Sequence, residues 1–183
     1  MKRMLTNAAL FKTLTGILFV TAAPAALASE AETSASATAG QRHSGTATGT
    51  ARYEGDAGFA RTDTRTGAVN AARSVAIGVD EDGLTLSLSL AVAPNRGPAY
   101  ATTFNFSIGA DGEASTSIGT ALATGGLART VGAGGRATAT PFGVNATSTA
   151  YGSTQHGGMV RAETRSDHYD RRDLPVRRVI YRR

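Results

Sequence analysis

The 183-residue chain contains no cysteine and no tryptophan, and aromatic residues make up only 6% of it. Without cysteine it cannot use the disulfide bridges that stabilise many small secreted domains. With so few aromatic side chains it lacks the stacking surfaces on which single-stranded nucleic acid binds, so we expect no nucleic-acid partner. Its stability must therefore come from burial, from backbone hydrogen bonds or from assembly.

Small side chains dominate what is present. About 60% of residues 29–160 are Gly, Ala, Ser or Thr, which is far from an ordinary globular mixture. Large aliphatic residues are correspondingly scarce, at a level that favours disorder when the net charge is also high. The net charge after residue 28 is only +2, so a folded chain with an unusual core is expected.

Residues 1–28 resemble a secretory signal peptide. Lys2, Arg3 and Lys12 give a positive start, residues 14–20 an apolar middle, and residues 26–28 read Ala-Leu-Ala before Ser29. The alternative, a membrane anchor, conflicts with the short and interrupted apolar run, and no later stretch approaches the length of a transmembrane segment. We therefore expect an exported protein that is periplasmic, cell-surface or extracellular.

The rest of the chain divides into three parts by composition. Residues 29–52 have no large apolar residue and predict a disordered, low-complexity spacer. Residues 53–160 alternate apolar and polar positions and predict a β domain. Residues 161–183 hold 8 arginines and 4 acidic residues and predict a basic tail.

The alternation is clearest over residues 73–80, 84–94 and 99–109, which are separated by turn sequences. It continues more weakly over residues 113–123 and 127–151, and residues 159–165 predict a last edge strand. The pattern predicts an all-β fold, an antiparallel meander of about six to eight strands closed as a barrel or packed like a sandwich. A β-solenoid is the alternative, since small residues between glycines also suit stacked coils.

We expect the larger residues of each strand to form the core. In the segment LTLSLSLAVAP, residues 84–94, one side carries four leucines and a valine and the other carries Thr, Ser and Ala. The predicted interior combines this side with the larger residues of the neighbouring strands, represented by Val75, Leu88, Phe104 and Ile118.

Residues with chemical potential are few, and none forms a recognisable motif. His43, His156 and His168 are the only histidines, and we interpret them as solvated. Residues 80–83, Asp-Glu-Asp-Gly, lack the alternating ligand spacing of a calcium loop and predict a hairpin turn. No catalytic, cofactor-binding or metal-ligating set emerges, so we expect no cofactor and no enzymatic activity.

The C-terminal tail is the most distinctive charged segment. Its arginine pairs alternate with aliphatic residues and a tyrosine, a composition suited to an anionic surface such as envelope polysaccharide or lipid headgroups. A solvated tail is the alternative. The candidate contacts are Arg171, Arg172, Arg177, Arg178, Arg182 and Arg183.

These features predict a non-enzymatic secreted or cell-envelope β protein with a structural or adhesive role. Self-association is one expected property, because flat strands of small uncharged residues permit growth from edge to edge. The alternative function is a small β-barrel that binds an apolar ligand against Leu86, Leu88, Phe104 and Phe106.

Overall fold

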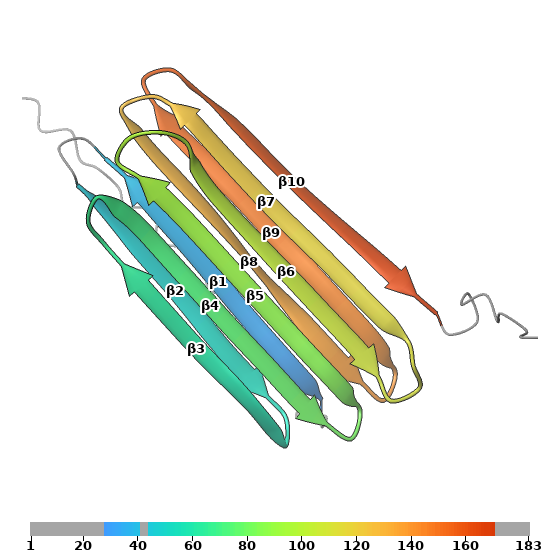
Figure 1. Ribbon diagram of the computed structural model, residues 1–183. Coiled ribbons are helices and arrows are strands. Elements are labelled where there is room, and N and C mark those ends of the chain that lie inside the picture. Colours follow the sequence, from blue (N-terminus) through green and yellow to red (C-terminus); the bar gives the residue numbers. More distant parts are fainter. Residues whose placement is uncertain (1–27, 41–43, 171–183) are drawn as a thin grey trace, which may run out of the picture.

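The computed structural model describes residues 28–40 and 44–170 and is all-β, with ten antiparallel strands (Figure 1). The predicted fold class is confirmed, with more strands than the six to eight expected. The strands are β1 (Ser29–Ala39), β2 (Gly45–Glu54), β3 (Ala57–Arg65), β4 (Val69–Asp80), β5 (Gly83–Pro94), β6 (Ala99–Gly109), β7 (Ala114–Gly125), β8 (Ala128–Thr140), β9 (Gly143–Gln155) and β10 (Gly158–Tyr169).

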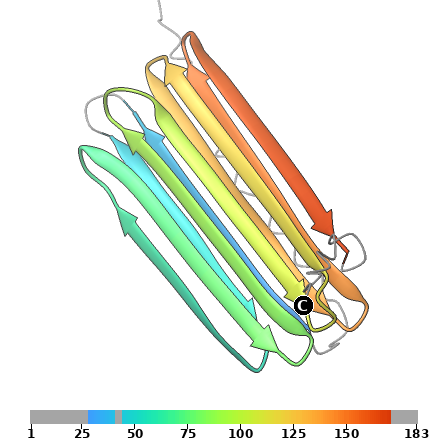
Figure 2. The same cartoon turned by 45° about the vertical axis from the view of Figure 1, so that its right-hand side comes forward.

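The strands form two facing sheets that do not close on each other. One sheet has the order β2-β1-β8-β9 and the other β10-β7-β6-β5-β4-β3. Figure 2 shows the two layers with their strands running nearly alongside one another. The architecture is therefore the sandwich-like form of the prediction, and the β-solenoid alternative is wrong, because neighbouring strands pair antiparallel.

The disordered spacer expected at residues 29–52 is also wrong, because this segment forms β1 and most of β2. β1 lies in the middle of its sheet, hydrogen-bonded to β2 on one side and to β8 on the other. Its alternate residues, including Ala31, Ala35, Ala37 and Ala39, are buried. In this fold alanine is the usual core residue, so the lack of large apolar side chains does not imply disorder.

The core lies on the opposite side of the strands from the one predicted. Val75, Leu88, Phe104 and Ile118 do share one face, because they are consecutive cross-strand partners in the register. That face is the outer one: Leu88 is 36% and Ile118 47% exposed. The small residues of the same strands point inward instead, and on β5 they are Thr85, Ser87, Ser89, Ala91 and Ala93, all buried.

The reason for this inversion is how closely the two sheets approach each other. No side chain fits at Gly78, because a Cβ atom would lie 2.7 Å from the main-chain oxygen of Glu30 in the facing sheet. Gly135 likewise makes room for the side-chain amide of Asn105. A leucine has no space in such an interface, whereas Ala, Ser and Gly interdigitate at native packing density.

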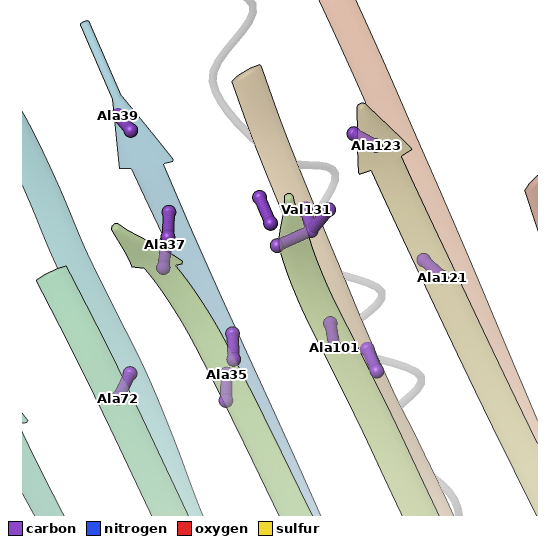
Figure 3. Close-up of a cluster of buried hydrophobic side chains, with 12 residues drawn as sticks. Ala35, Ala37, Ala39, Ala72, Ala101, Ala121, Ala123 and Val131 are labelled. Atoms are coloured by element: carbon purple, nitrogen blue, oxygen red, sulfur yellow. The ribbon is translucent and has the colours of Figure 1, made fainter. Parts of the chain in front are cut away.

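Along the strands, the interior changes from apolar to polar. One part is a cluster of alanines around Val131, contributed by both sheets (Figure 3). The cluster contains Ala35, Ala37, Ala39, Ala72, Ala91, Ala93, Ala99, Ala101, Ala121, Ala123, Val131 and Ala133.

The other part is a network of buried hydroxyl groups and one amide. Thr33 in β1 makes 2.7 Å hydrogen bonds to both Ser87 and Ser89 in the facing sheet. Ser87 donates to Asn105 Oδ1 at 2.5 Å, and Asn105 Nδ2 donates to Ser117 Oγ at 3.2 Å. Asn105 Nδ2 also donates to the carbonyl of Thr147 across the sandwich. These polar groups can be buried because they are paired.

Candidate interaction surfaces

The outer face of the six-stranded sheet carries many large apolar side chains, interrupted by one row, Arg73–Leu90–Thr102–Thr120, in which only Leu90 is apolar. The register aligns them in rows across β4, β5, β6 and β7, such as Val75–Leu88–Phe104–Ile118. The neighbouring rows contribute Ile77, Val79, Leu84, Leu86, Leu90, Val92, Tyr100, Phe106, Ile108 and Leu122. We call these fourteen residues the apolar face.

The apolar face is bordered on both sides by charged edge strands. Asp63 on β3 binds both Arg61 of the same strand and Arg73 of β4, with distances of 3.0 and 2.6 Å from guanidinium nitrogen to carboxylate oxygen. The hydrogen bond from Arg73, then that from Arg61, lowers the pKa of Asp63 below its usual value. An apolar centre with a charged rim is the composition of a protein interface.

β10 forms the opposite border and has the same type of pattern. Its outward residues Arg161, Glu163, Arg165 and Asp167 alternate in charge, and they pair along the strand at 3.3 Å and 2.9 Å. The hydrogen bond to Asp167 raises the pKa of Arg165. The sequence predicted an edge strand at residues 159–165 but did not predict this surface, because residues 161–183 were placed in a basic tail. That boundary is wrong, since residues 161–169 belong to β10.

The outer face of the four-stranded sheet is polar. Cross-strand hydroxyl pairs join Ser34 to Thr50 at 2.8 Å and Ser36 to Thr48 at 2.7 Å. A third pair joins Thr38 to Thr130 at 3.0 Å. One outer face of the sandwich is therefore suited to water and the other is not, which gives the molecule a polar and an apolar side.

The six arginines predicted to contact an anionic surface, Arg171, Arg172, Arg177, Arg178, Arg182 and Arg183, lie outside the described residues, as does His43. The predicted signal peptide likewise falls there, apart from residue 28. His156 lies in the β9–β10 turn with a positive φ of 60°, and His168 lies on β10. Both are exposed. The structure does not bring them together with each other or with a metal-binding group of side chains among the residues that it describes.

The hairpin turn predicted at residues 80–83 is confirmed. β4 ends at Asp80 and β5 begins at Gly83, and Asp80 Oδ1 accepts hydrogen bonds from the amides of Asp82 and Gly83 at 2.9 and 3.1 Å. Partial burial, with the nearby charge of Asp80, raises the pKa of Asp82. These carboxylates shape a turn rather than converge on a common point.

Arg129 is a buried charged residue that sequence analysis did not single out. It lies in β8 and donates from Nη2 to the carbonyl oxygens of Pro94 and Asn95, both at 3.1 Å. Its Nη1 donates to the carbonyl of Gly126 at 3.4 Å. Because all three acceptors are main-chain oxygens at or next to strand ends, Arg129 holds the end of the sandwich together and does not form part of a reactive group.

The four residues predicted to hold an apolar ligand are neighbours, but they belong to the apolar face. Leu86 pairs with Phe106 and Leu88 with Phe104 on adjacent strands. All four point away from the facing sheet, so they do not line an enclosed barrel interior. Any ligand of these residues would have to bind a flat surface.

Within residues 28–40 and 44–170, no helix has the length and hydropathy needed to cross a membrane. Comparison of the chain with protein-family models, with curated proteins and with solved structures found no match in any of the three.

Proposed function

We propose that this protein is a non-enzymatic structural or adhesive component of the cell envelope or exterior, and that it acts by packing its apolar face against that of another copy. The observation that carries the proposal is the apolar face itself. Monomeric soluble proteins rarely expose a contiguous apolar patch of more than a few hundred Å², and larger patches mark interaction sites.

The size and shape of the face favour a flat partner. The five rows on four strands that contain these fourteen residues, together with six smaller or polar ones, cover about 650 Å² at the usual strand and residue spacings. A standard protein interface buries roughly 800 Å² per partner, so the apolar face with part of its rim has the area needed. A second sheet can pack on it at about 10 Å, as sheets do in sandwiches.

The charges of the rim favour a second copy in particular. A twofold axis in the plane of the face and perpendicular to the strands places β3 over β3 and β10 over β10, with reversed direction. When the axis lies midway between the rows of Arg61 and Asp63, each of these residues faces its opposite in the partner. The same rotation places Arg165 over the partner's Glu163, so both borders are complementary.

The test places a charge in the centre of the apolar face. Leu88→Lys should reduce self-association by at least tenfold, because the ammonium group loses its water at the interface. Light scattering after size-exclusion chromatography, over a range of concentrations, measures the change. Thr48→Lys is the matched control, because it adds the same charge to the polar outer face and should leave association unchanged.

A strictly monomeric wild-type protein would contradict the proposal, as would a Leu88→Lys variant that associates normally. Binding to phosphatidylcholine vesicles by a monomeric wild type, with loss in Leu88→Lys, would replace the second copy by lipid. Far-UV circular dichroism verifies that both variants are folded, which is expected since Leu88 and Thr48 point outward.

A further inference from the structure

Among the residues that the structure describes, no strand pairs with the outer hydrogen-bonding side of the edge strand β10. β10 pairs with β7 along its whole length and is the last strand in the order of its sheet. Of its 12 residues all are exposed except Asp167, which is half-buried. A long, straight edge presents a row of main-chain N–H and C=O groups to a further strand.

The outward charges of β10 alternate strictly in sign. Arg161, Glu163, Arg165 and Asp167 occupy four successive outward positions, with Met159 and Tyr169 at the two ends. When an even number of alternating charges is read in the reverse direction, each positive charge lies opposite a negative one. In an antiparallel pair of identical strands, every arginine can therefore face a carboxylate.

We propose that β10 pairs antiparallel with β10 of a second copy, about a twofold axis at Thr164, to form one continuous twelve-stranded sheet. In this register Arg161 faces the partner's Asp167 and Glu163 faces the partner's Arg165, so symmetry gives four ion pairs. Met159 faces the partner's Tyr169. Thr164 faces the partner's Thr164 on the other side of the sheet.

Neighbouring registers are unfavourable. A shift of two residues in one direction places Glu163 opposite the partner's Glu163, and a shift in the other direction places Arg165 opposite the partner's Arg165. Like charges directly opposite each other destabilise a strand pair. A shift of one residue would join the charged side of one strand to the Ala, Thr and Ser side of the other. The charges thus favour the proposed register, since a shift of four residues keeps only two of the four ion pairs.

β3, the other edge of the sheet, is less suited to pairing with itself. Its outward charges Arg61, Asp63 and Arg65 are odd in number, so the central antiparallel register places Asp63 opposite the partner's Asp63. β3 could instead pair with the partner's β10 through three ion pairs, which would continue from copy to copy. The β10 pair gives four ion pairs and closes as a twofold dimer, the commonest symmetry of oligomers.

Cysteine crosslinking tests the register directly, because the chain has no cysteine of its own. Directly opposed residues of antiparallel strands have Cα atoms about 4.5 to 5.5 Å apart, within the range of a disulfide. Thr164→Cys should therefore give a disulfide-linked dimer under oxidised glutathione, seen on a non-reducing gel. Ala162→Cys should not, since its two copies would lie about 13 Å apart at the usual rise per residue.

Thr64→Cys on β3 is the control for the other edge. Thr64 and Thr164 are the same residue type and are both exposed on an edge strand. Random collision would therefore crosslink Thr64→Cys and Thr164→Cys equally. Equal crosslinking of the two, or crosslinking of Ala162→Cys as strong as that of Thr164→Cys, would overturn the proposal. A mixed dimer formed only between Thr64→Cys and Thr164→Cys would show head-to-tail pairing of β3 with β10 instead, and would also overturn it.

Charge reversal gives a second test without a covalent bond. The variant Arg161→Glu/Arg165→Glu has an acidic β10 and Glu163→Arg/Asp167→Arg a basic one. Each alone should lose the β10 pair and at least tenfold in affinity, and an equimolar mixture should restore it. Failure of the mixture to restore association would contradict the proposal.

The cysteine crosslinks separate the two proposals, because Thr164 lies on the opposite side of the sheet from the apolar face and β10 is unchanged in Leu88→Lys. The charge-reversal variants also alter the rim of the apolar face, so they are compared in the Leu88→Lys background. Thr164→Cys crosslinking should therefore persist when Leu88→Lys is added. A wild type that associates and crosslinks at residue 164, but whose association is unchanged by Leu88→Lys, would contradict the proposed function while it supports the β10 pair.

Discussion

The two faces of strands β4 to β7 differ in a way that reverses the usual relation between side-chain size and burial. Ala91 is 0% exposed, whereas Leu90, the preceding residue on β5, is 37% exposed. The inner face lies against a second sheet so close that only small side chains fit. The outer face carries the large side chains, and no sheet formed by residues 28–40 and 44–170 covers it. In these strands the large side chains lie on the face available for contact, and the small side chains form the core.

Exchanging side-chain size between the two faces should have the largest effect. Ala91→Leu places three extra carbons between the sheets and should cost about 3 kcal/mol or more of the free energy of unfolding, because overpacking separates the layers. Leu90→Ala removes a half-exposed side chain and should cost about 1 kcal/mol or less. Urea unfolding followed by far-UV circular dichroism measures both.

If Leu90→Ala were the more harmful change, the large side chains would form the core, as predicted from the sequence, and the assignment of the core to the small side chains would be wrong. Association must be controlled in this comparison, because Leu90 belongs to the apolar face. Measurements at several protein concentrations separate the stability of the single chain from that of the assembly.

The buried polar network provides the next contrast between inside and outside. Asn105→Ala removes the acceptor of the Ser87 hydroxyl and the donor to the Thr147 carbonyl. We expect a loss of about 2 kcal/mol, since buried polar groups would lose their partners. Asn145→Ala, at an exposed position of β9, is the matched control and should change stability by less than about 0.5 kcal/mol. Equal losses in the two variants would show that the network adds no stability.

Strand positions could be predicted from the sequence, but the direction of the side chains could not. The alternation over residues 99–109 coincides with β6, and residues 84–94 fall within β5. A period of two defines two faces, but it does not say which one is buried. That depends on the composition of the sheet opposite, which comes from β1, β2, β8 and β9. Since residues 29–52 were expected to be disordered, half of that sheet was missing from the prediction.

The candidate surfaces were predictable only in part. The large side chains of Leu88 and Phe104 were correctly placed on a common face, and the segment 159–165 was correctly expected at a sheet edge. The alternating charges of β10 were visible in the sequence, but their meaning depends on two facts of the fold. Within the described part of the chain, β10 has no strand on its outer side, and its charges point to the same side as the apolar face.

The smallest expected effect concerns Asp82 in the β4–β5 turn, away from both faces. Because burial and the charge of Asp80 raise its pKa in the folded protein, folding disfavours the ionised form of Asp82. Its contribution to stability is therefore most favourable below the unfolded-state pKa, near 3.9. It is lost as the pH rises through the higher folded-state pKa.

Asp82→Asn should accordingly raise the melting temperature slightly at pH 7 and have no such benefit at pH 3. Circular dichroism melts at the two pH values measure the difference, and Glu81→Gln, at the exposed neighbour in the same turn, provides the control. A benefit of Asp82→Asn that is the same at both pH values would assign it to the geometry of the turn instead of to the carboxylate charge.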